Sequence, residues 1–478
     1  MSKSFKKLSL FMLILALLFV TACNSGTPAA SDPPPADPPA QTPAPSDPPA
    51  NPPADQPADT PAEPGIADLF AQPAEFSMNG EEIKILVWGG GPQAGTLEGD
   101  LILERQAAVE EKYNTKIVWE VLPWGENANR IIEGGLSGEP PADIVLLDLY
   151  GAVPLINQGL LLPIDDLFDL DDPRWPEGMR EFGSYNGKQY GFLMSVNAGS
   201  GIYYNRTLLE REGLPDPHEL MAQDQWNWDK FLEILKAATK DTDGDGVTDQ
   251  WGLVNHAGIL ARIMLYANGG SIIKQDDSGK WVYSGTDPNS LEAIEFLNDL
   301  VNTHKVMMPN TNRNFGDYND AATTFTAGKA AFVTGELWEG GGHMNAMTDE
   351  MGFAYFPKGP KATNYSNVVT NFTMWYMPAN AKHPKEVARI WQELQLWDRV
   401  EQNKRESNEN NMSTEEDVEL AMKISDFVNP LIYPGIGIEG DFFNTVWAIL
   451  HGETAPASGM ESIKQTVQSK LDETFNAQ

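Results

Sequence analysis

Ile83-Lys84-Ile85-Leu86-Val87-Trp88, followed by Gly89-Gly90-Gly91-Pro92, is the stretch on which the fold class rests. A short apolar run that ends at a glycine turn predicts a buried strand. Residues 98–113 then carry apolar side chains at helical spacing, and residues 116–121 and 142–147 predict two more strands. Strands that alternate with helices are typical of an α/β fold with a parallel sheet, which is the fold class we expect.

The later part of the chain carries helix patterns. Asn227 stands where it can cap a helix whose apolar residues follow at positions 231, 234, 235 and 238. Residues 288–303, the stretch after Pro384 and residues 463–475 predict further helices. We therefore expect the C-terminal part to be mainly helical.

The composition limits the classes of protein to which the chain can belong. The 478 residues fit two or three domains or one large two-lobed unit. There are 33 Lys and Arg against 68 Asp and Glu, which gives a net charge of -35. Phosphate backbones and anionic membrane surfaces repel such a chain, so we expect no nucleic acid partner and membrane contact only through a specific anchor. The single cysteine excludes intramolecular disulfides, cysteine-based zinc sites and a redox pair.

The N-terminus has the pattern of an export signal. A lysine-rich start precedes an uncharged apolar run over residues 8–20, which is too short to span a bilayer as a helix. Val20-Thr21-Ala22-Cys23 follows directly and resembles the bacterial lipobox. This resemblance implies a lipoprotein signal peptide over residues 1–22, cleavage before Cys23 and lipid attachment to it. The alternative is a plain signal peptide with an incidental cysteine.

A proline-rich segment follows. Residues 24–64 hold 15 of the 35 prolines, no Lys or Arg and no large apolar side chain. No core can form from this composition, and the proline density favours an extended chain. We expect residues 23–65, the lipidated cysteine and its tether, to have no fixed structure and to hold the folded part off the membrane.

The folded part resembles a known family. Phe325-Thr326-Ala327-Gly328-Lys329-Ala330-Ala331-Phe332 is similar to a strand motif of the extracellular solute-binding proteins of bacterial ABC importers, the family that includes maltose- and oligosaccharide-binding proteins. Other stretches match the same family in the same order, and the lipobox fits its lipoprotein form. They are residues 83–88, 142–147, 159–165, 203–205, 213–215 and 226–231, then Gly335 and Trp338, and finally Pro378 with residues 383–388.

This resemblance implies a type II, two-lobed α/β fold in which hinge strands join the lobes and a small solute binds between them. The first lobe would comprise residues 66–192 plus 322–372, and the second residues 193–321 plus 373–478. Closure on the ligand would present a surface to the transmembrane subunits of an ABC permease. We expect a monomer, lipid-anchored on the extracellular face of the cell membrane.

Sugars are the solute class that the side chains favour. Aromatic rings stack on the C–H faces of sugars, and carboxylates and amides bind their hydroxyl groups. Trp338, which follows the matched strand motif, is the first choice, and the alternative for each aromatic residue is core packing. The candidate ligand-binding residues are Trp88, Trp124, Asp148, Tyr204, Glu336, Trp338, Glu339, Trp375 and Tyr376.

A second motif has the spacing of a calcium loop. Asp241, Asp243, Asp245 and Asp249 stand at positions 1, 3, 5 and 9, and the Val247 carbonyl stands at position 7. Position 12 is a glycine instead of the bidentate glutamate of a full EF-hand. We expect a structural Ca²⁺ site or, alternatively, a solvated acidic turn, and no other cofactor.

Enzyme motifs are missing from the sequence. It contains no HExxH pair, no GxSxG elbow and no Walker P-loop. We therefore predict a solute-binding subunit of an ABC importer and no enzyme. The alternatives are a surface-anchored carbohydrate-active enzyme, a binding protein for a non-sugar solute and a purely structural or adhesive lipoprotein.

Overall fold

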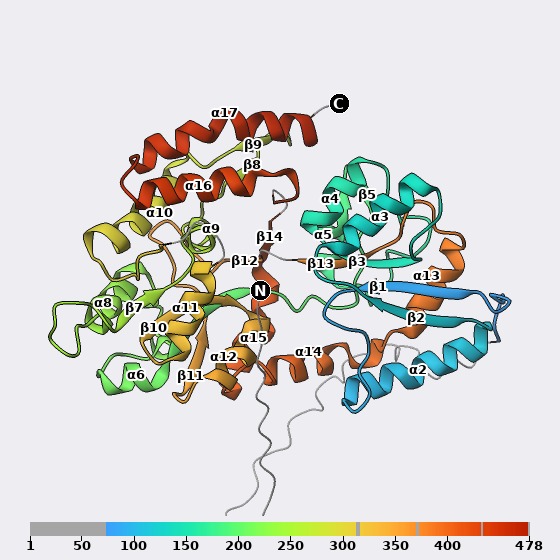
Figure 1. Cartoon of the computed structure of the whole chain (residues 1–478), viewed down its shortest axis with the longest axis horizontal. Coiled ribbons are helices and arrows are strands. Elements are labelled where there is room, and N and C mark those ends of the chain that lie inside the picture. Colours follow the sequence, from blue (N-terminus) through green and yellow to red (C-terminus); the bar gives the residue numbers. More distant parts are fainter. Residues whose placement is uncertain (1–72, 312–315, 370–371, 432–433, 477–478) are drawn as a thin grey trace, which may run out of the picture. The chain divides into compact units, whose positions relative to one another are not determined.

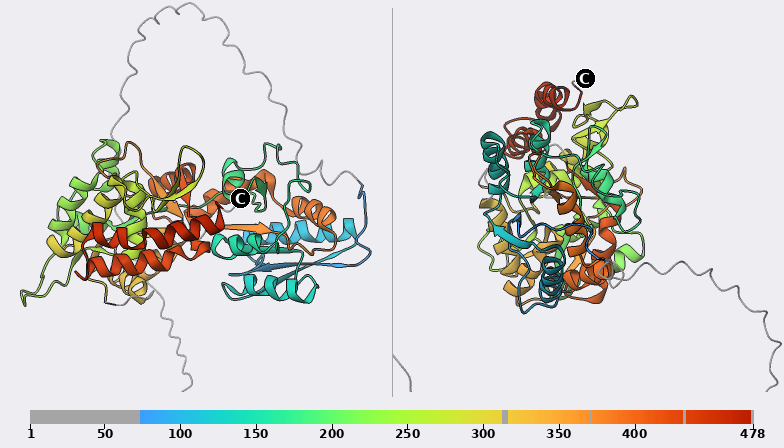
Figure 2. Two further views of the ribbon diagram at one scale, coloured as in Figure 1. Left: turned by 90° about the horizontal axis from the view of Figure 1, so that it is seen from above. Right: turned by 90° about the vertical axis from the view of Figure 1, so that its right-hand side faces the viewer.

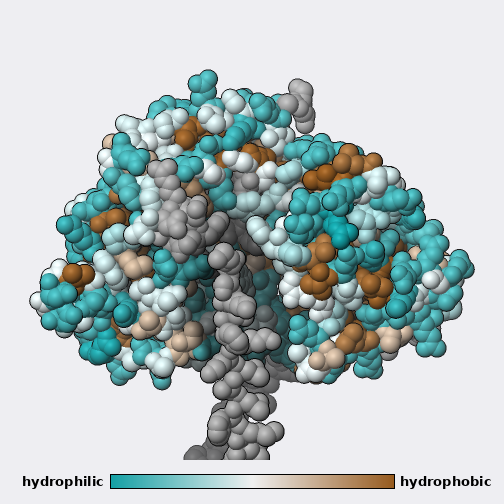
Figure 3. All heavy atoms as spheres, viewed as in Figure 1, coloured by the Kyte–Doolittle hydropathy of each residue, from teal (hydrophilic) through white to brown (hydrophobic). Residues whose placement is uncertain are grey.

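The computed structural model describes residues 73–311, 316–369, 372–431 and 434–476, which form two lobes with one main sheet each (Figure 1). The predicted signal peptide, Cys23 and the tether lie outside the described residues. Within these ranges, no helix combines the length and the apolar character needed to cross a membrane. Hydrophilic residues cover most of the face of both lobes in Figure 3, in keeping with the acidic composition.

The first lobe is built on a four-stranded sheet of order β13-β3-β1-β2. β1 (Glu82–Val87) runs parallel to β2 (Lys116–Val121) and β3 (Ile144–Asp148), as the strand–helix alternation predicts, and β13 (Thr373–Tyr376) is antiparallel to β3. α2 (Leu97–Tyr113) packs against α13 (Pro384–Leu394) on one face of this sheet, and α3 (Glu126–Ser137) and α4 (Leu149–Asn157) pack on the other (Figure 2). The smaller elements are α5 (Glu177–Gly183), β4 (Ser184–Tyr185) and β5 (Lys188–Gln189).

The second lobe is built on a sheet of order β11-β6-β10-β7. β10 (Ala330–Glu336) is buried along its whole length, antiparallel to β6 (Ser200–Asn205) and parallel to β7 (Trp251–Val254), and β11 (Met351–Ala354) pairs with β6. The helices around this sheet are α6 (Arg206–Arg211), α7 (Pro217–Ala222), α8 (Trp228–Ala238), α9 (Ala257–Ala267), α10 (Pro288–Asn298) with the π-helical turn η1 (Asp299–Thr303), α11 (Gly316–Thr326), η2 (Leu337–Glu339), α12 (Gly340–Ala346), α15 (Glu415–Ile424), η4 (Ser425–Phe427), η5 (Pro434–Ile436), α16 (Ile438–Leu450) and α17 (Pro456–Thr474). A hairpin of β8 (Ile273–Gln275) and β9 (Trp281–Tyr283) completes the lobe.

Local sequence explains the start of α8. The Asn227 side chain accepts a hydrogen bond of 3.1 Å from the Lys230 N–H, which confirms the predicted helix cap. Trp226 and Trp228 on either side of it are buried; Trp226 donates to the Tyr355 carbonyl at 2.7 Å, and Trp228 stacks on Phe296. These two tryptophans therefore belong to the core.

Three stretches of the described chain connect the lobes. One is residues 193–199, and a second includes β12 (Asn367–Val369), which pairs in parallel with β14 (Val428–Pro430). The third is η3 (Trp397–Arg399) with α14 (Val400–Glu409), which runs from the end of α13 in the first lobe to α15 in the second (Figure 1). The helices from α13 to α17 confirm that the C-terminal part is mainly helical.

The division between the lobes differs from the expected one. Residues 322–372 were expected in the first lobe, but β10 and β11 lie within the second sheet because both form backbone hydrogen bonds with β6. Residues 373–478 were expected in the second lobe, but β13 and α13 lie in the first because β13 pairs with β3 and α13 packs on α2. The strand ladders, which residue patterns do not reveal, determine the true division.

Candidate functional site

A cavity of about 580 Å³ lies where the connecting stretches meet the two sheets. We call it the interlobe cavity. Its walls come from the turn after β1, from residues 193–199, from the end of β10, from the start of β13 and from the end of α14. Three of the predicted ligand-binding residues line it together: Trp88, Glu336 and Trp338.

Trp338 is the most exposed of these three, with 66% of its surface accessible. Its indole Nε1 donates to the Glu336 carboxylate at 3.0 Å, which fixes the orientation of the ring. The Glu336 backbone is fixed in turn, because its N–H donates to the Glu339 carboxylate at 2.7 Å and its carbonyl accepts from the Tyr203 hydroxyl at 2.8 Å. An oriented ring with an open face suits stacking against the apolar face of a ligand.

Trp88 approaches the same cavity from the first lobe. It directly follows β1 and is half-buried, and Gly89 beside it also lines the cavity. A ligand in this cavity therefore meets an aromatic residue from each lobe and one carboxylate, that of Glu336. This donor set fits a neutral polyhydroxylated molecule, because it combines flat apolar contacts with a hydrogen-bond acceptor.

Five polar residues complete the cavity, and the sequence analysis did not identify them: Ser195, Asn197, Thr373, Ser407 and Asn411. Two of them are held in place by hydrogen bonds. Asn197 accepts a bond of 3.2 Å from the Asn408 side chain, and Asn411 accepts one of 3.1 Å from the Gly341 N–H. Both bonds involve residues far apart in the chain, so no local motif marks these side chains.

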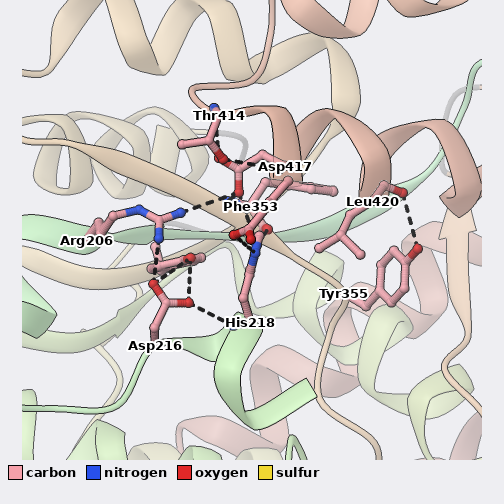
Figure 4. Close-up of polar contacts among 10 residues, drawn as sticks. Arg206, Asp216, His218, Phe353, Tyr355, Thr414, Asp417 and Leu420 are labelled. Carbon is pink, nitrogen blue, oxygen red and sulfur yellow. Dashed lines mark hydrogen bonds and ion pairs between the residues drawn. The ribbon is translucent and has the colours of Figure 1, made fainter. Parts of the chain in front are cut away.

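A partly buried ionic network attaches the α14–α15 segment, which carries Ser407 and Asn411 near its middle, to the second lobe (Figure 4). Asp417 is fully buried and accepts a hydrogen bond of 2.9 Å from the Phe353 N–H of β11. The guanidinium of Arg206 lies 3.6 Å from Asp417 and 2.6 Å from Asp216. Farther along α15, the Tyr355 hydroxyl donates to the Leu420 carbonyl at 3.3 Å.

His218 is the second cation of this network. Burial lowers its pKa, but its bonds to Asp417 and to the Phe353 carbonyl outweigh burial and raise the pKa to about 9. Its Nε2 lies 2.7 Å from that carbonyl, and its Nδ1 lies 3.3 Å from Glu416. With an acceptor at each ring nitrogen, the imidazolium form is favoured at neutral pH.

Trp124 and Asp148 lie together near the carboxyl ends of β2 and β3, outside the lining of the interlobe cavity. Asp148 caps α4 by accepting from the Gly151 N–H at 2.8 Å. Burial raises the pKa of Asp148, and hydrogen bonds from Gly151 and the Trp124 indole offset part of that effect. Trp375 lines a neighbouring cavity of about 440 Å³ instead.

Three predicted site residues have structural roles and do not line the interlobe cavity. Tyr204 is fully buried, and its hydroxyl donates to Asp216 at 2.9 Å. Tyr376 is also buried, on the inward face of β13. Burial raises the pKa of both hydroxyl groups. The Glu339 carboxylate binds the Glu336 backbone, as described above. These residues were predicted to bind ligand from their position along the chain, which does not show whether a side chain points into the core or toward the cavity.

A hydrogen bond joins the lobes outside this cavity. The Tyr150 hydroxyl at the start of α4 donates to the Glu439 carboxylate of α16 at 2.6 Å. Glu439 also forms an ion pair with the buried Arg262 of α9. Burial raises the pKa of Tyr150, so this hydroxyl remains protonated as a donor.

The predicted calcium loop brings three of its five residues together. One carboxylate oxygen from each of Asp241, Asp243 and Asp249 lies within 4.8 Å of the others. The Asp241 carboxylate accepts from the N–H groups of Gly246 and Gly244, which lower its pKa. The Asp245 carboxylate accepts from the Val247 N–H at 2.8 Å. Such oxygen donors are the type that Ca²⁺ prefers.

Position 12 of this loop is Gly252, which belongs to β7. A Cβ atom there would lie 2.5 Å from the Leu235 carbonyl oxygen of α8, so the close packing of strand and helix requires a glycine. No side chain can therefore supply a ligand from this position.

Comparison with known proteins agrees with this fold. Residues 99–392 match the family described as bacterial extracellular solute-binding protein. Over 265 residues, the chain is 23% identical to an uncharacterised extracellular-binding protein of an ABC transporter from Pyrococcus horikoshii, and the match spans 54% of each chain. The aligned part thus covers about half the length of this relative.

Solved structures show the same two-lobed fold. A solute-binding protein of an ABC transporter from Thermotoga lettingae, bound to α-D-tagatose, has a TM-score of 0.59 at 18% identity over 82% of this chain and 100% of that one. A cyclo/maltodextrin-binding protein in complex with maltotetraose has a TM-score of 0.63 at 16% identity over 82% of this chain and 98% of that one.

The chain belongs to the family of bacterial extracellular solute-binding proteins, since the match covers more than half of it. Members of this family bind solutes outside the cytoplasm and are not enzymes. The family, the two-lobed fold and the non-enzymatic class that the sequence resemblance implied are therefore confirmed.

Proposed function

We propose that this protein captures a sugar or an oligosaccharide in the interlobe cavity and delivers it to the permease of an ABC importer. The observation that carries the proposal is the cavity itself, in which Trp88 from one lobe and Trp338 with Glu336 from the other face a single space. The two similar structures, one bound to α-D-tagatose and the other in complex with maltotetraose, support the same ligand class.

The connecting stretches suit a binding protein that opens and closes. Residues of 193–199 and of α14 both line the cavity, so ligand contacts act on the segments between the lobes. A ligand that binds the closed arrangement more tightly shifts the population toward it. The closed form is the one that we propose the permease recognises.

We further propose that the lipobox places this protein on the outer face of the cell membrane through a lipid on Cys23. A single acyl chain binds membranes reversibly, and two chains hold more stably. We also propose that the loop of Asp241, Asp243 and Asp249 binds Ca²⁺ as a brace for the second lobe, supported by the approach of its three carboxylates.

A titration of the full chain with sugars tests the ligand class. Calorimetry with monosaccharides and with gluco- and manno-oligosaccharides is expected to show saturable binding of one series, with the sugar recovered intact. Cleavage of the sugar would favour the carbohydrate-active enzyme instead. Binding of none of these sugars, together with binding of an amino acid, a polyamine or a phosphorylated compound, would replace the sugar with that solute class.

A further inference from the structure

A second cavity adjoins the interlobe cavity within the first lobe. We call it the adjoining cavity; its volume is about 440 Å³, and it is lined by the Gly89–Gly91 turn, by Trp119 of β2 and by Trp375 of β13. We propose that the two cavities form one extended binding groove, which makes the preferred ligand an oligosaccharide of at least two sugar rings. This inference rests on the proposed function and specifies the length of its ligand.

The two cavities lie side by side over the same part of the structure. Gly89 lines both of them. Thr373 lines the interlobe cavity and Trp375 the adjoining one, and both point to the same face of β13 because side chains alternate along a strand. Two residues of a strand span about 7 Å, so the cavities are neighbours along β13.

The adjoining cavity has an aromatic wall. The Trp119 and Trp375 rings have centroids 6.2 Å apart and meet edge to face at 69°. Trp119 is held by a hydrogen bond of 2.9 Å from its indole Nε1 to the Gln106 side chain of α2. Both rings pack against the core of the first lobe but are only partly buried, so each keeps an accessible surface.

The glycine turn permits this arrangement. A Cβ atom at Gly91 would lie 3.0 Å from the Trp119 Cβ, so the turn passes directly over that side chain. A larger residue at position 91 would push the turn and the ring apart and change the wall of the adjoining cavity. The three consecutive glycines, for which the sequence analysis had only a turn, thus shape the groove.

Polar groups border the aromatic wall. Gln93, Glu98 and Asn403 line the adjoining cavity, and the Asn403 side chain donates to Glu98 at 3.3 Å. A flat apolar wall with carboxylate and amide groups at its edge repeats the chemistry of the interlobe cavity around Trp338 and Glu336. The two sites are separated by two residues of β13. They fit two rings of one sugar chain, since an aromatic face and hydrogen-bond partners are available for each ring.

Calorimetry with ligands of increasing length tests the groove. The probes are glucose, maltose, maltotriose and maltotetraose, and in parallel mannose, mannobiose, mannotriose and mannotetraose, each with the full chain. We expect affinity in one series to rise about tenfold or more between the shortest bound sugar and the longer ones, which corresponds to about 1.4 kcal/mol.

Three variants test the contributions of the two cavities to binding separately. Ile102 is partly exposed on α2 and lines the adjoining cavity, so Ile102→Trp fills that cavity from its edge. This variant is expected to abolish the gain with length and to leave the affinity for the shortest sugar within about twofold. Trp375→Ala is expected to reduce the same gain, whereas Trp338→Ala weakens sugars of every length. Thermal unfolding shows that each variant is folded.

Two results would overturn the inference. If Ile102→Trp leaves the gain with length intact, or weakens all lengths equally, the adjoining cavity is not part of the site, although sugar binding itself stands. If the unchanged protein binds no sugar of either series, the proposed function fails and the groove fails with it.

Discussion

His218 and Asp417 form an ion pair across 3.1 Å that joins α7 to α15 in the second lobe. The carboxylate is fully buried and the imidazole is 14% exposed, so water screens the pair weakly. Asp216, Glu416 and the guanidinium of Arg206 lie around them. This pair is the centre of the contacts that hold α15 to β11, and α14 with its cavity residues precedes α15 directly.

The His218 pair predicts a dependence of stability on pH. The pKa of about 9 in the folded state lies above the value of 6.5 of an ordinary histidine. Protonation therefore stabilises the fold fully below pH ~6.5, and this contribution, about 3 kcal/mol, is lost as pH rises through ~9. His218→Gln should lower the melting temperature most at pH 6 and progressively less toward pH 10. A difference that is independent of pH would contradict a charged His218.

Trp338→Ala is expected to weaken sugar binding about tenfold or more, because it removes the stacking face in the interlobe cavity. Stability should change little, since the side chain is 66% exposed. Trp338→Phe should retain part of the affinity. Leu136→Ala, which changes a residue of α3 that is 86% exposed, is the matched control. Equal affinities of Trp338→Ala and the control would exclude Trp338 from the site.

The calcium proposal predicts stabilisation by the metal. Calcium at a hundredfold excess over its dissociation constant should stabilise the folded state by about 2.7 kcal/mol, seen as a rise in melting temperature that a chelator reverses. Asp243→Asn should reduce this rise. Asp277→Asn, at an exposed acidic residue between β8 and β9, should not. If neither calcium nor the chelator changes the melting temperature, the loop is a solvated turn and not a calcium site.

The Tyr150–Glu439 hydrogen bond predicts a change in the opening of the lobes. A bond to a charged group contributes about 1.5–3 kcal/mol, so Tyr150→Phe should shift the ligand-free protein toward an open arrangement. Small-angle scattering should then show a larger radius of gyration. Sugar affinity should fall several-fold, because part of the binding free energy is used to close the lobes. Tyr190→Phe, confined to the first lobe, is the control. An unchanged radius would show that this bond does not restrain opening.

Substitution of Cys23 by alanine tests the anchor. Without the cysteine no lipid can be attached, so the protein should move from the membrane fraction to the medium, with sugar binding unchanged. Continued retention in the membrane fraction of Cys23→Ala cells would remove the lipid anchor from the proposal.

Local patterns in the sequence were enough to predict the elements and the family. The apolar run before Gly89 and the Asn227 cap depend on neighbouring residues, and both predictions were confirmed. The division into lobes was not predictable in the same way. It depends on which strands pair, and β13 forms hydrogen bonds with β3 across more than 200 intervening residues.

The candidate site shows the same limit. Trp338 and Glu336 were identified because a strand motif precedes them, and they line the cavity with Trp88. Tyr204 and Tyr376 do not line the cavity, because both faces of β6 are buried and Tyr376 lies on the buried face of β13. Asn197, Ser407 and Asn411 were missed because no motif in their own segments marks them, and only the folded chain brings them to the cavity.

The walls of the interlobe cavity belong to separate segments, namely the β1 turn, residues 193–199, the end of β10 and the end of α14. The wall of residues 193–199 is joined to two of the others, because the Asn408 side chain of α14 donates to Asn197 and the Leu337 N–H after β10 donates to the Gly199 carbonyl. A substitution in one wall therefore moves its neighbours as well. A chain of this design is expected to change its ligand only through coordinated substitutions in several segments.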